Sequence, residues 1–170
     1  MIRLFLAFTS FLPLKSNHSF GSFIGYLLYL FNSEAKSVSK QNLEICFPSL
    51  SESELKSLLK KVLTETGKGL TESGLIWNQN FKDNAKLIRN INGEHFLDSS
   101  KKTILLVPHM GCWEITGRVL AEKRKVIFMY RPLRSKKQND YLFSRRNQGN
   151  LTMASADKIG ILKIQRALNN

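Results

Sequence analysis

A histidine and a glutamate stand close together in the middle of the chain, in the order Val107-Pro-His109-Met-Gly111-Cys-Trp-Glu114. An imidazole that is oriented by a carboxylate can take a proton from a hydroxyl group, so His109 and Glu114 are a candidate general base and its partner. Five positions along one α-helix are about 140° apart, which would separate the two side chains. We therefore predict that His109 lies in a loop, that Gly111 lets the backbone turn, and that Glu114 lies in the first turn of a helix.

The segments around this pair have an α/β pattern. Residues 103–108 form a continuous apolar run just before His109, and we predict a buried parallel strand there. Ligands of open α/β sheets bind beyond the carboxyl ends of the strands, which is where His109 would lie. The elements predicted after the pair are a helix over 115–122, a strand over 125–130, a helix over 136–147, a strand over 151–154 and a helix over 157–168. This alternation predicts an α/β fold with a mainly parallel central sheet and right-handed crossovers.

The chain before this α/β part is expected to be helical. Ser51 and Glu54 have the spacing of a capping box, and apolar residues follow at helical spacing, which predicts a helix that runs toward Trp77. Residues 88–91, followed by Asn92-Gly93, are predicted to be a short strand and a turn. The predicted organisation is a hydrophobic membrane-anchoring segment over 1–31, a helical segment over 32–80 and an α/β part over 81–170.

The first 31 residues are strongly apolar, since only Arg3 and Lys15 carry a charge. Two apolar stretches, 4–14 and 20–31, are each shorter than the roughly 20 residues that span a bilayer. Four interpretations are open: a cleaved signal peptide, one long tilted helix interrupted near Pro13, one or two helices lying in the membrane interface, or a buried core helix. We favour membrane attachment, because the unbroken apolarity exceeds what a one-sided soluble helix requires.

The formal net charge of +13 is concentrated in the second part of the chain. Residues 101–170 contain fifteen Lys and Arg and four Asp and Glu, a net of +11, whereas residues 1–100 contain eleven and nine, a net of +2. The basic segment 118–146 predicts an anionic partner nearby: a nucleic acid, an anionic lipid or a phosphorylated substrate. The two cysteines, Cys46 and Cys112, exclude a disulfide scaffold and a zinc site of the Cys-x-x-Cys type.

The residues around His109 resemble the H-x-G-x-W-E signature of the late acyltransferases of lipid A biosynthesis, the lauroyl and myristoyl transferases. These belong to the wider glycerolipid acyltransferase group, which has an H-x4-D/E motif. Other stretches resemble further elements of the family in the family's order: Asn42-Leu-Glu-Ile-Cys-Phe-Pro48, Gly67 with Glu72, Tyr130-Arg-Pro-Leu133, and Arg145/Arg146 with Gly149. Several elements in the right order are more specific than the His/Glu pair alone.

The resemblance implies transfer of a fatty acyl chain from acyl carrier protein to a hydroxyl of a Kdo-modified lipid A precursor. The expected partners are the acyl carrier protein, an anionic phosphorylated glycolipid acceptor and the inner membrane at its cytoplasmic face, and no nucleic acid, cofactor or metal is expected. By the resemblance, His109 is the base and Glu114 its partner. Arg131, Arg145 and Arg146 would bind phosphate on the lipid or the carrier, or stabilise the oxyanion.

The sequence also departs from the family's pattern, because the later D-Q and F-F-G elements are absent. The resemblance therefore implies an incomplete α/β acyltransferase domain, as a fragment or as a truncated and inactive product. One alternative function is thus an inactive membrane-associated relative. Another is a basic membrane-associated protein that binds nucleic acid through the segment 118–146, although that segment contains no recognised nucleic-acid motif.

Overall fold

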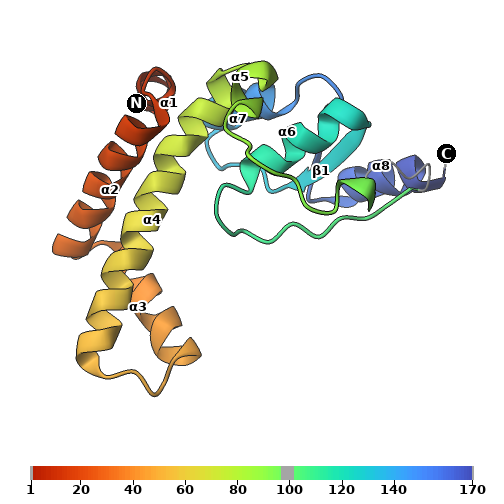
Figure 1. Cartoon of the computed structure of the whole chain (residues 1–170). Helices are drawn as coiled ribbons and strands as arrows, with labels where there is room; N and C mark the ends of the chain where they lie inside the picture. Colours follow the sequence, from red (N-terminus) through yellow and green to blue (C-terminus); the bar gives the residue numbers. More distant parts are fainter. Residues whose placement is uncertain (1, 97–101, 170) are drawn as a thin grey trace. The chain divides into compact units, whose positions relative to one another are not determined.

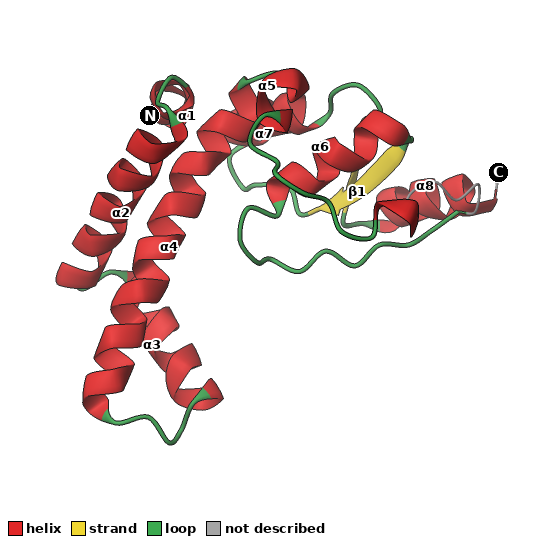
Figure 2. Cartoon of the chain, viewed as in Figure 1, coloured by secondary structure: helices red, strands yellow, loops and turns green. Residues whose placement is uncertain are grey.

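The computed structural model describes residues 2–96 and 102–169. Figure 1 shows the elements in chain order, and Figure 2 shows that most of them are helices. Their bounds are α1 Ile2–Ser10, α2 Leu14–Leu30, α3 Glu34–Cys46, α4 Glu52–Asn78, α5 Phe81–Ala85, the short 3-10 helix η1 Glu94–Phe96, α6 Glu114–Lys123, β1 Val126–Tyr130, α7 Lys136–Arg146, β2 Leu151–Ser155 and α8 Lys158–Asn169. The contacts divide the chain into two compact units, a helical unit over Phe5–Leu75 and an α/β unit that contains the chain from Ile76 onward.

The apolar start of the chain forms two helices, α1 and α2, with a break around Pro13. Pro13 stands at the N-cap of α2, where its missing N–H and its restriction of the preceding residue favour a new helix start. The 17 residues of α2 extend about 26 Å, which is less than the roughly 30 Å of a bilayer's hydrocarbon core. Within residues 2–96 and 102–169, no helix has both the length and the apolarity needed to cross a membrane.

Helices α2 and α4 approach each other through glycines. A Cβ atom on Gly67 of α4 would overlap the carbonyl oxygen of Gly21 and the backbone of Gly25 on α2. Such close backbone approach is possible only where the side chains are very small. Gly67 of α4 is thus a packing position, and α4 passes through it without a break.

Polar side chains add to the contact between these helices. Asn17 donates from its side-chain amide to the carbonyl oxygens of Thr9 (2.9 Å) and Thr71 (3.1 Å), and all three residues are buried. On the next position of α2, the Nε2 atom of His18 lies 2.5 Å from Oε1 of Glu72. The helical unit therefore combines glycine packing with buried hydrogen bonds that fix how α2 lies on α4.

The start of α4 confirms the sequence prediction. The Ser51 backbone N–H donates to Oε2 of Glu54 (2.8 Å), and the Glu54 N–H approaches the Ser51 hydroxyl (3.4 Å), which together form a capping box. Apolar residues at helical spacing on α4 then pack with Leu43 of α3. This buried cluster consists of Leu43, Leu55, Leu59 and Leu63.

The α/β unit contains a parallel pair of strands, β1 and β2, as the sequence predicts for these segments. Their register runs from Val126 opposite Leu151 to Tyr130 opposite Ser155. Helix α7 connects the two strands, and the predicted helices on either side of them form as α6 and α8. Gly117 of α6 lies against β1, where a Cβ atom would be 2.9 Å from the Phe128 ring.

Two strand predictions are wrong. Residues 103–108 form no strand, and Ile104 and Leu106 are 71% and 92% exposed. In the described residues the sheet consists of β1 and β2, and the run 103–108, exposed along most of its length, is not the buried strand that such an apolar run predicts. Residues 88–91 also lack strand structure, although the turn at Asn92-Gly93 forms, with Gly93 at φ 80°. The central sheet is therefore smaller than predicted.

Candidate functional site

Glu114 begins helix α6, as predicted, and the loop before it makes the predicted turn. Gly111 has φ 54°, a left-handed conformation that favours glycine, and Trp113 stands at the N-cap just before Glu114. A carboxylate in the first turn also interacts favourably with the positive end of the helix dipole. The backbone of Glu114 is consequently held in place by helix α6.

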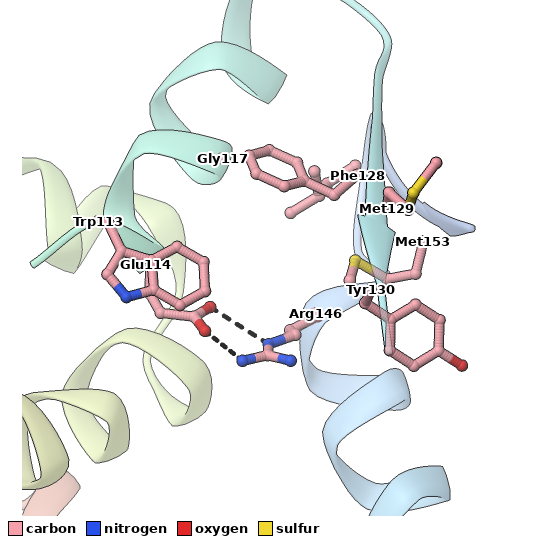
Figure 3. A pocket seen from close by; sticks show the side chains of 9 residues that line it. Trp113, Glu114, Gly117, Phe128, Met129, Tyr130, Arg146 and Met153 are labelled. Carbon is pink, nitrogen blue, oxygen red and sulfur yellow. Dashed lines mark hydrogen bonds and ion pairs between the residues drawn. The ribbon is translucent and has the colours of Figure 1, made fainter. Parts of the chain in front are cut away.

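The Glu114 carboxylate is held by three donors from two other helices. The Nε atom of Arg146 donates to Oε2 (3.2 Å) and its Nη2 atom donates to Oε1, so that the ion pair is bidentate. The indole Nε1–H of Trp77, near the end of α4, also donates to Oε2 (3.0 Å). The Glu114 and Arg146 side chains are only 14% and 22% exposed. Figure 3 shows the two groups facing each other from α6 and α7.

His109 lies in the loop before α6 and is exposed. Its imidazole packs on the indole of Trp113, with 4.4 Å between the ring centroids and 54° between the ring planes. The structure thus places His109 beside the residue that precedes Glu114, while the contacts of the Glu114 carboxylate go to Arg146 and Trp77. The two members of the predicted pair are near each other along the loop but are not hydrogen-bonded here.

The three predicted arginines have different surroundings. Arg146 belongs to the ion pair with Glu114. The guanidinium of Arg145 lies over the Tyr141 ring, 5.5 Å from its centroid, on the same helix. Arg131 follows β1 directly and is exposed. Of the five predicted site residues, the structure therefore brings Glu114 and Arg146 into contact, and it leaves His109 and Arg131 exposed to solvent.

Arg118 is a second basic residue of the site region that sequence reasoning did not single out. Its guanidinium donates to the carbonyl oxygens of Gln79 (3.1 Å) and Arg145 (3.3 Å), which ties α6 to the end of α4 and to α7. Burial lowers the pKa of Arg118 from its usual value, which still leaves it charged at neutral pH. Its position four residues after Glu114 is the one available signal, because that spacing puts both side chains on one face of α6.

A small pocket opens beside the ion pair. Its lining combines the charged pair with apolar side chains from both strands, as Figure 3 shows. The lining residues are Trp113, Glu114, Gly117, Phe128, Met129, Tyr130, Arg146, Leu151 and Met153. The cavity volume of about 50 Å³ is enough for a few water molecules.

Within the part of the chain that the structure describes, no group of three or more His, Cys, Asp or Glu side chains is arranged to hold a metal ion. The donors gathered around Glu114 are nitrogen atoms of an arginine and a tryptophan, neither of which is an ordinary metal ligand. The interactions that these residues make with Glu114 are hydrogen bonds.

Comparison with known proteins identifies the family to which this arrangement belongs. The family model of bacterial lipid A biosynthesis acyltransferases matches residues 2–170. The chain belongs to the bacterial lipid A biosynthesis acyltransferase family. This match includes both units and all five predicted site residues, so the family resemblance of the sequence motifs is confirmed.

Two curated members of the family are similar to this chain. It is 32% identical over 124 residues to the lipid A biosynthesis lauroyltransferase of Escherichia coli K12, and this alignment covers 71% of the chain and 40% of the relative. It is 26% identical over 119 residues to a lipid A biosynthesis acyltransferase of Haemophilus influenzae, with 68% of the chain and 37% of that relative covered. The aligned part of this chain thus spans about two fifths of the length of these acyltransferases.

Proposed function

We propose that the protein transfers a fatty acyl chain from acyl carrier protein to a hydroxyl group of a Kdo-modified lipid A precursor. The observation that carries this proposal is the match of the lipid A acyltransferase family along residues 2–170. The names of the two curated relatives, a lauroyltransferase and an acyltransferase of lipid A biosynthesis, support the same reaction class.

In the proposed mechanism, His109 is the general base. Its imidazole takes the proton of the acceptor hydroxyl as the hydroxyl oxygen attacks the carbonyl carbon of the acyl thioester. The new C–O bond then forms an ester, the C–S bond breaks, and the imidazolium returns the proton to the leaving thiolate. No acyl intermediate on the protein is needed. The exposure of His109 supports this role, because an acceptor can reach its ring.

Glu114 is proposed to orient His109 and to stabilise the imidazolium. In the structure Glu114 is bonded to Arg146 and Trp77, so the proposal requires the loop over 102–110 to bring the imidazole onto the carboxylate. Arg131 and Arg145 are the proposed contacts for phosphate or for the oxyanion. Arg146 is proposed to act mainly through its ion pair with Glu114, which is where its guanidinium lies.

The proposed place of action is the cytoplasmic face of the inner membrane. Aromatic side chains near the start of the chain support this proposal, because Phe8 of α1, Phe11 in the turn that follows and Phe23 of α2 are exposed. Aromatic rings are favoured at the boundary between lipid and water. The basic segment 118–146 fits both a phosphorylated glycolipid and an acidic carrier protein.

The test is a cell-free assay with a lipid A precursor and an acyl chain loaded on acyl carrier protein. His109→Ala and Glu114→Ala are expected to lower the rate of transfer by about two to four orders of magnitude, as removal of a general base or its partner does. Matched controls are His95→Ala and Glu122→Ala, which change an exposed histidine and an exposed glutamate outside the site and should transfer at the wild-type rate.

Three outcomes would contradict the proposal in different ways. If His109→Ala keeps the wild-type rate, His109 is not the base. If Glu114→Ala keeps it, the carboxylate has no role in the reaction. If the wild-type protein transfers no acyl group, the alternative of an inactive membrane-associated relative is favoured instead.

A further inference from the structure

We infer that Trp77 is a positioning residue that holds the Glu114 carboxylate in the orientation the reaction needs. This inference rests on the proposed function, because it assigns Trp77 a part in the same acyl transfer. Trp77 lies 37 positions before Glu114 in the sequence and outside the H-x-G-x-W-E stretch. It acts through Glu114 and does not itself touch the reacting atoms.

One side chain contacts both members of the ion pair. The Trp77 indole N–H donates to Oε2 of Glu114 at 3.0 Å, and its ring faces the guanidinium of Arg146 with 4.7 Å from Cζ to the ring centroid. Trp77 is only 8% exposed, so both contacts are shielded from water. A cation–π contact and a charge-assisted hydrogen bond are each strengthened by such shielding.

The arrangement of donors distinguishes the two oxygen atoms of the carboxylate. Oε2 of Glu114 accepts from both Trp77 and Arg146, whereas Oε1 accepts from Nη2 of Arg146. Each carboxylate oxygen has two lone-pair positions. The structure therefore assigns Oε1 as the oxygen that can still accept a hydrogen bond from an N–H of the His109 imidazole. The role of Trp77 is to donate to Oε2, so that both lone pairs of Oε2 are used.

The chain is also held just after Trp77. The carbonyl of Gln79, two positions further along, accepts a hydrogen bond from the Arg118 guanidinium on α6 (3.1 Å). Trp77 and Gln79 are thus both bonded to α6. An indole with only two side-chain torsions, on a backbone held in this way, places its N–H more precisely than a long flexible donor would.

The decisive variant is Trp77→Phe, which keeps an aromatic ring near Arg146 and removes the donor to Glu114. In the acyl-transfer assay we expect kcat to fall about tenfold or more, because a hydrogen bond to a charged group is lost. KM for both substrates should stay within about twofold, since Trp77 is not among the residues that line the pocket beside Glu114.

Tyr141→Phe is the matched control. It also removes a single donor from an aromatic side chain, and the acceptor is Asn78, the neighbour of Trp77. A comparable loss of thermal stability is expected from both variants, but only Trp77→Phe should lose kcat. If both variants lose kcat equally, or if Trp77→Phe keeps the wild-type kcat, Trp77 is a structural residue and the inference is wrong.

A second measurement does not depend on activity. The indole N–H resonance of Trp77, assigned by its loss in Trp77→Phe, should move upfield in Glu114→Gln, because the anionic acceptor is gone. An unchanged resonance would show that the hydrogen bond is absent and would overturn the inference. If the wild-type protein transfers no acyl group, the proposed function fails, and this resonance alone then decides whether Trp77 holds Glu114.

Discussion

At the scale of single residues, the folded chain gives Glu114 partners that lie far away in the sequence. Sequence spacing pairs Glu114 with His109, five positions away, whereas the structure bonds it to Arg146 and Trp77, 32 and 37 positions away. A carboxylate that is held by a bidentate arginine and an indole belongs to the candidate site and also stabilises the packing of the helices around that site. Substitutions at Glu114 should therefore be judged by stability as well as by rate.

A second carboxylate, Glu54, gives a prediction about pH. The Ser51 hydroxyl and backbone N–H donate to Glu54 and lower its pKa below the usual value of 4.5. A carboxyl group whose pKa is lower in the folded state stabilises the fold above its unfolded pKa, and this contribution is lost as the pH falls through the folded value. At neutral pH, Glu54→Gln should therefore open the start of α4 more easily than the wild type.

The measurement is amide hydrogen exchange at Leu55, whose N–H donates to the Ser51 carbonyl at 2.9 Å. After correction for the intrinsic exchange rate, the difference in protection between wild type and Glu54→Gln should disappear as the pH falls below 4.5. A difference that stays constant across this range would mean that the ionised carboxylate does not stabilise the helix start.

At the scale of elements, local patterns predicted several of the helices and both strands of the sheet. Capping signals and apolar periodicity are properties of one segment, and they correctly indicate α4, α6, β1, α7, β2 and α8. The run over 103–108 shows the limit of this reasoning. Whether an apolar run becomes a strand depends on a neighbour that offers hydrogen bonds and on a layer that covers it, and neither is visible in the run itself.

The candidate site was predictable only in part for the same reason. The loop position of His109, the turn at Gly111 and the helical start at Glu114 follow from residues that are adjacent in sequence. The contacts of Trp77 and Arg146 with Glu114 join three separate helices, and no spacing rule within one helix indicates them. Backbone geometry that adjacent residues determine could be predicted from the sequence. Side-chain contacts that depend on the packing of separate helices could not.

The glycines of α4 allow a matched test of helix packing. Gly67→Ala puts a methyl group onto the backbone of Gly21 and Gly25, and because backbone cannot move aside locally, we expect a loss of about 1–3 kcal/mol in the free energy of unfolding. Gly69, two positions along the same helix, has nothing within 4 Å of the point where a Cβ atom would stand. Gly69→Ala should therefore stabilise the chain by about 0.8–1 kcal/mol through helix propensity alone.

Denaturant unfolding of the two variants and the wild type measures both effects under one condition. The informative result is that the two substitutions should change the free energy of unfolding in opposite directions. If Gly67→Ala stabilises the protein as much as Gly69→Ala does, then α2 and α4 do not approach as closely as described.

At the scale of the whole molecule, charge is distributed very unevenly. The net charge of residues 101–170, with fifteen basic and four acidic residues, is +11 of the total of +13. Lys136 and Lys137 are exposed at the start of α7, which has no acidic residue in its first turn. Positive charge is unfavourable at the positive end of a helix dipole, so stability alone does not account for these two lysines.

We therefore predict that Lys136 and Lys137 contribute to binding of anionic surfaces. The double variant Lys136→Gln/Lys137→Gln should bind phosphatidylglycerol vesicles more weakly, by about 1 kcal/mol per lysine, with no loss of thermal stability. Vesicle co-sedimentation at two salt concentrations measures this, and binding by the wild type should weaken at high salt.

The control is Lys60→Gln/Lys61→Gln, which removes two exposed lysines from the part of the chain whose net charge is only +2. Equal weakening by both double variants would indicate that binding depends on total charge and not on the start of α7. Binding that is unaffected by salt would indicate that the interaction is apolar.

The position of the two tryptophans has a practical consequence. Both tryptophans of the chain lie at the same carboxylate: Trp77 is bonded to Glu114, and Trp113 precedes Glu114 and carries the His109 ring. Light absorbed and emitted by tryptophan in this protein therefore originates at the candidate site and nowhere else. Binding of a ligand beside His109 can therefore be followed by tryptophan emission from the unlabelled protein.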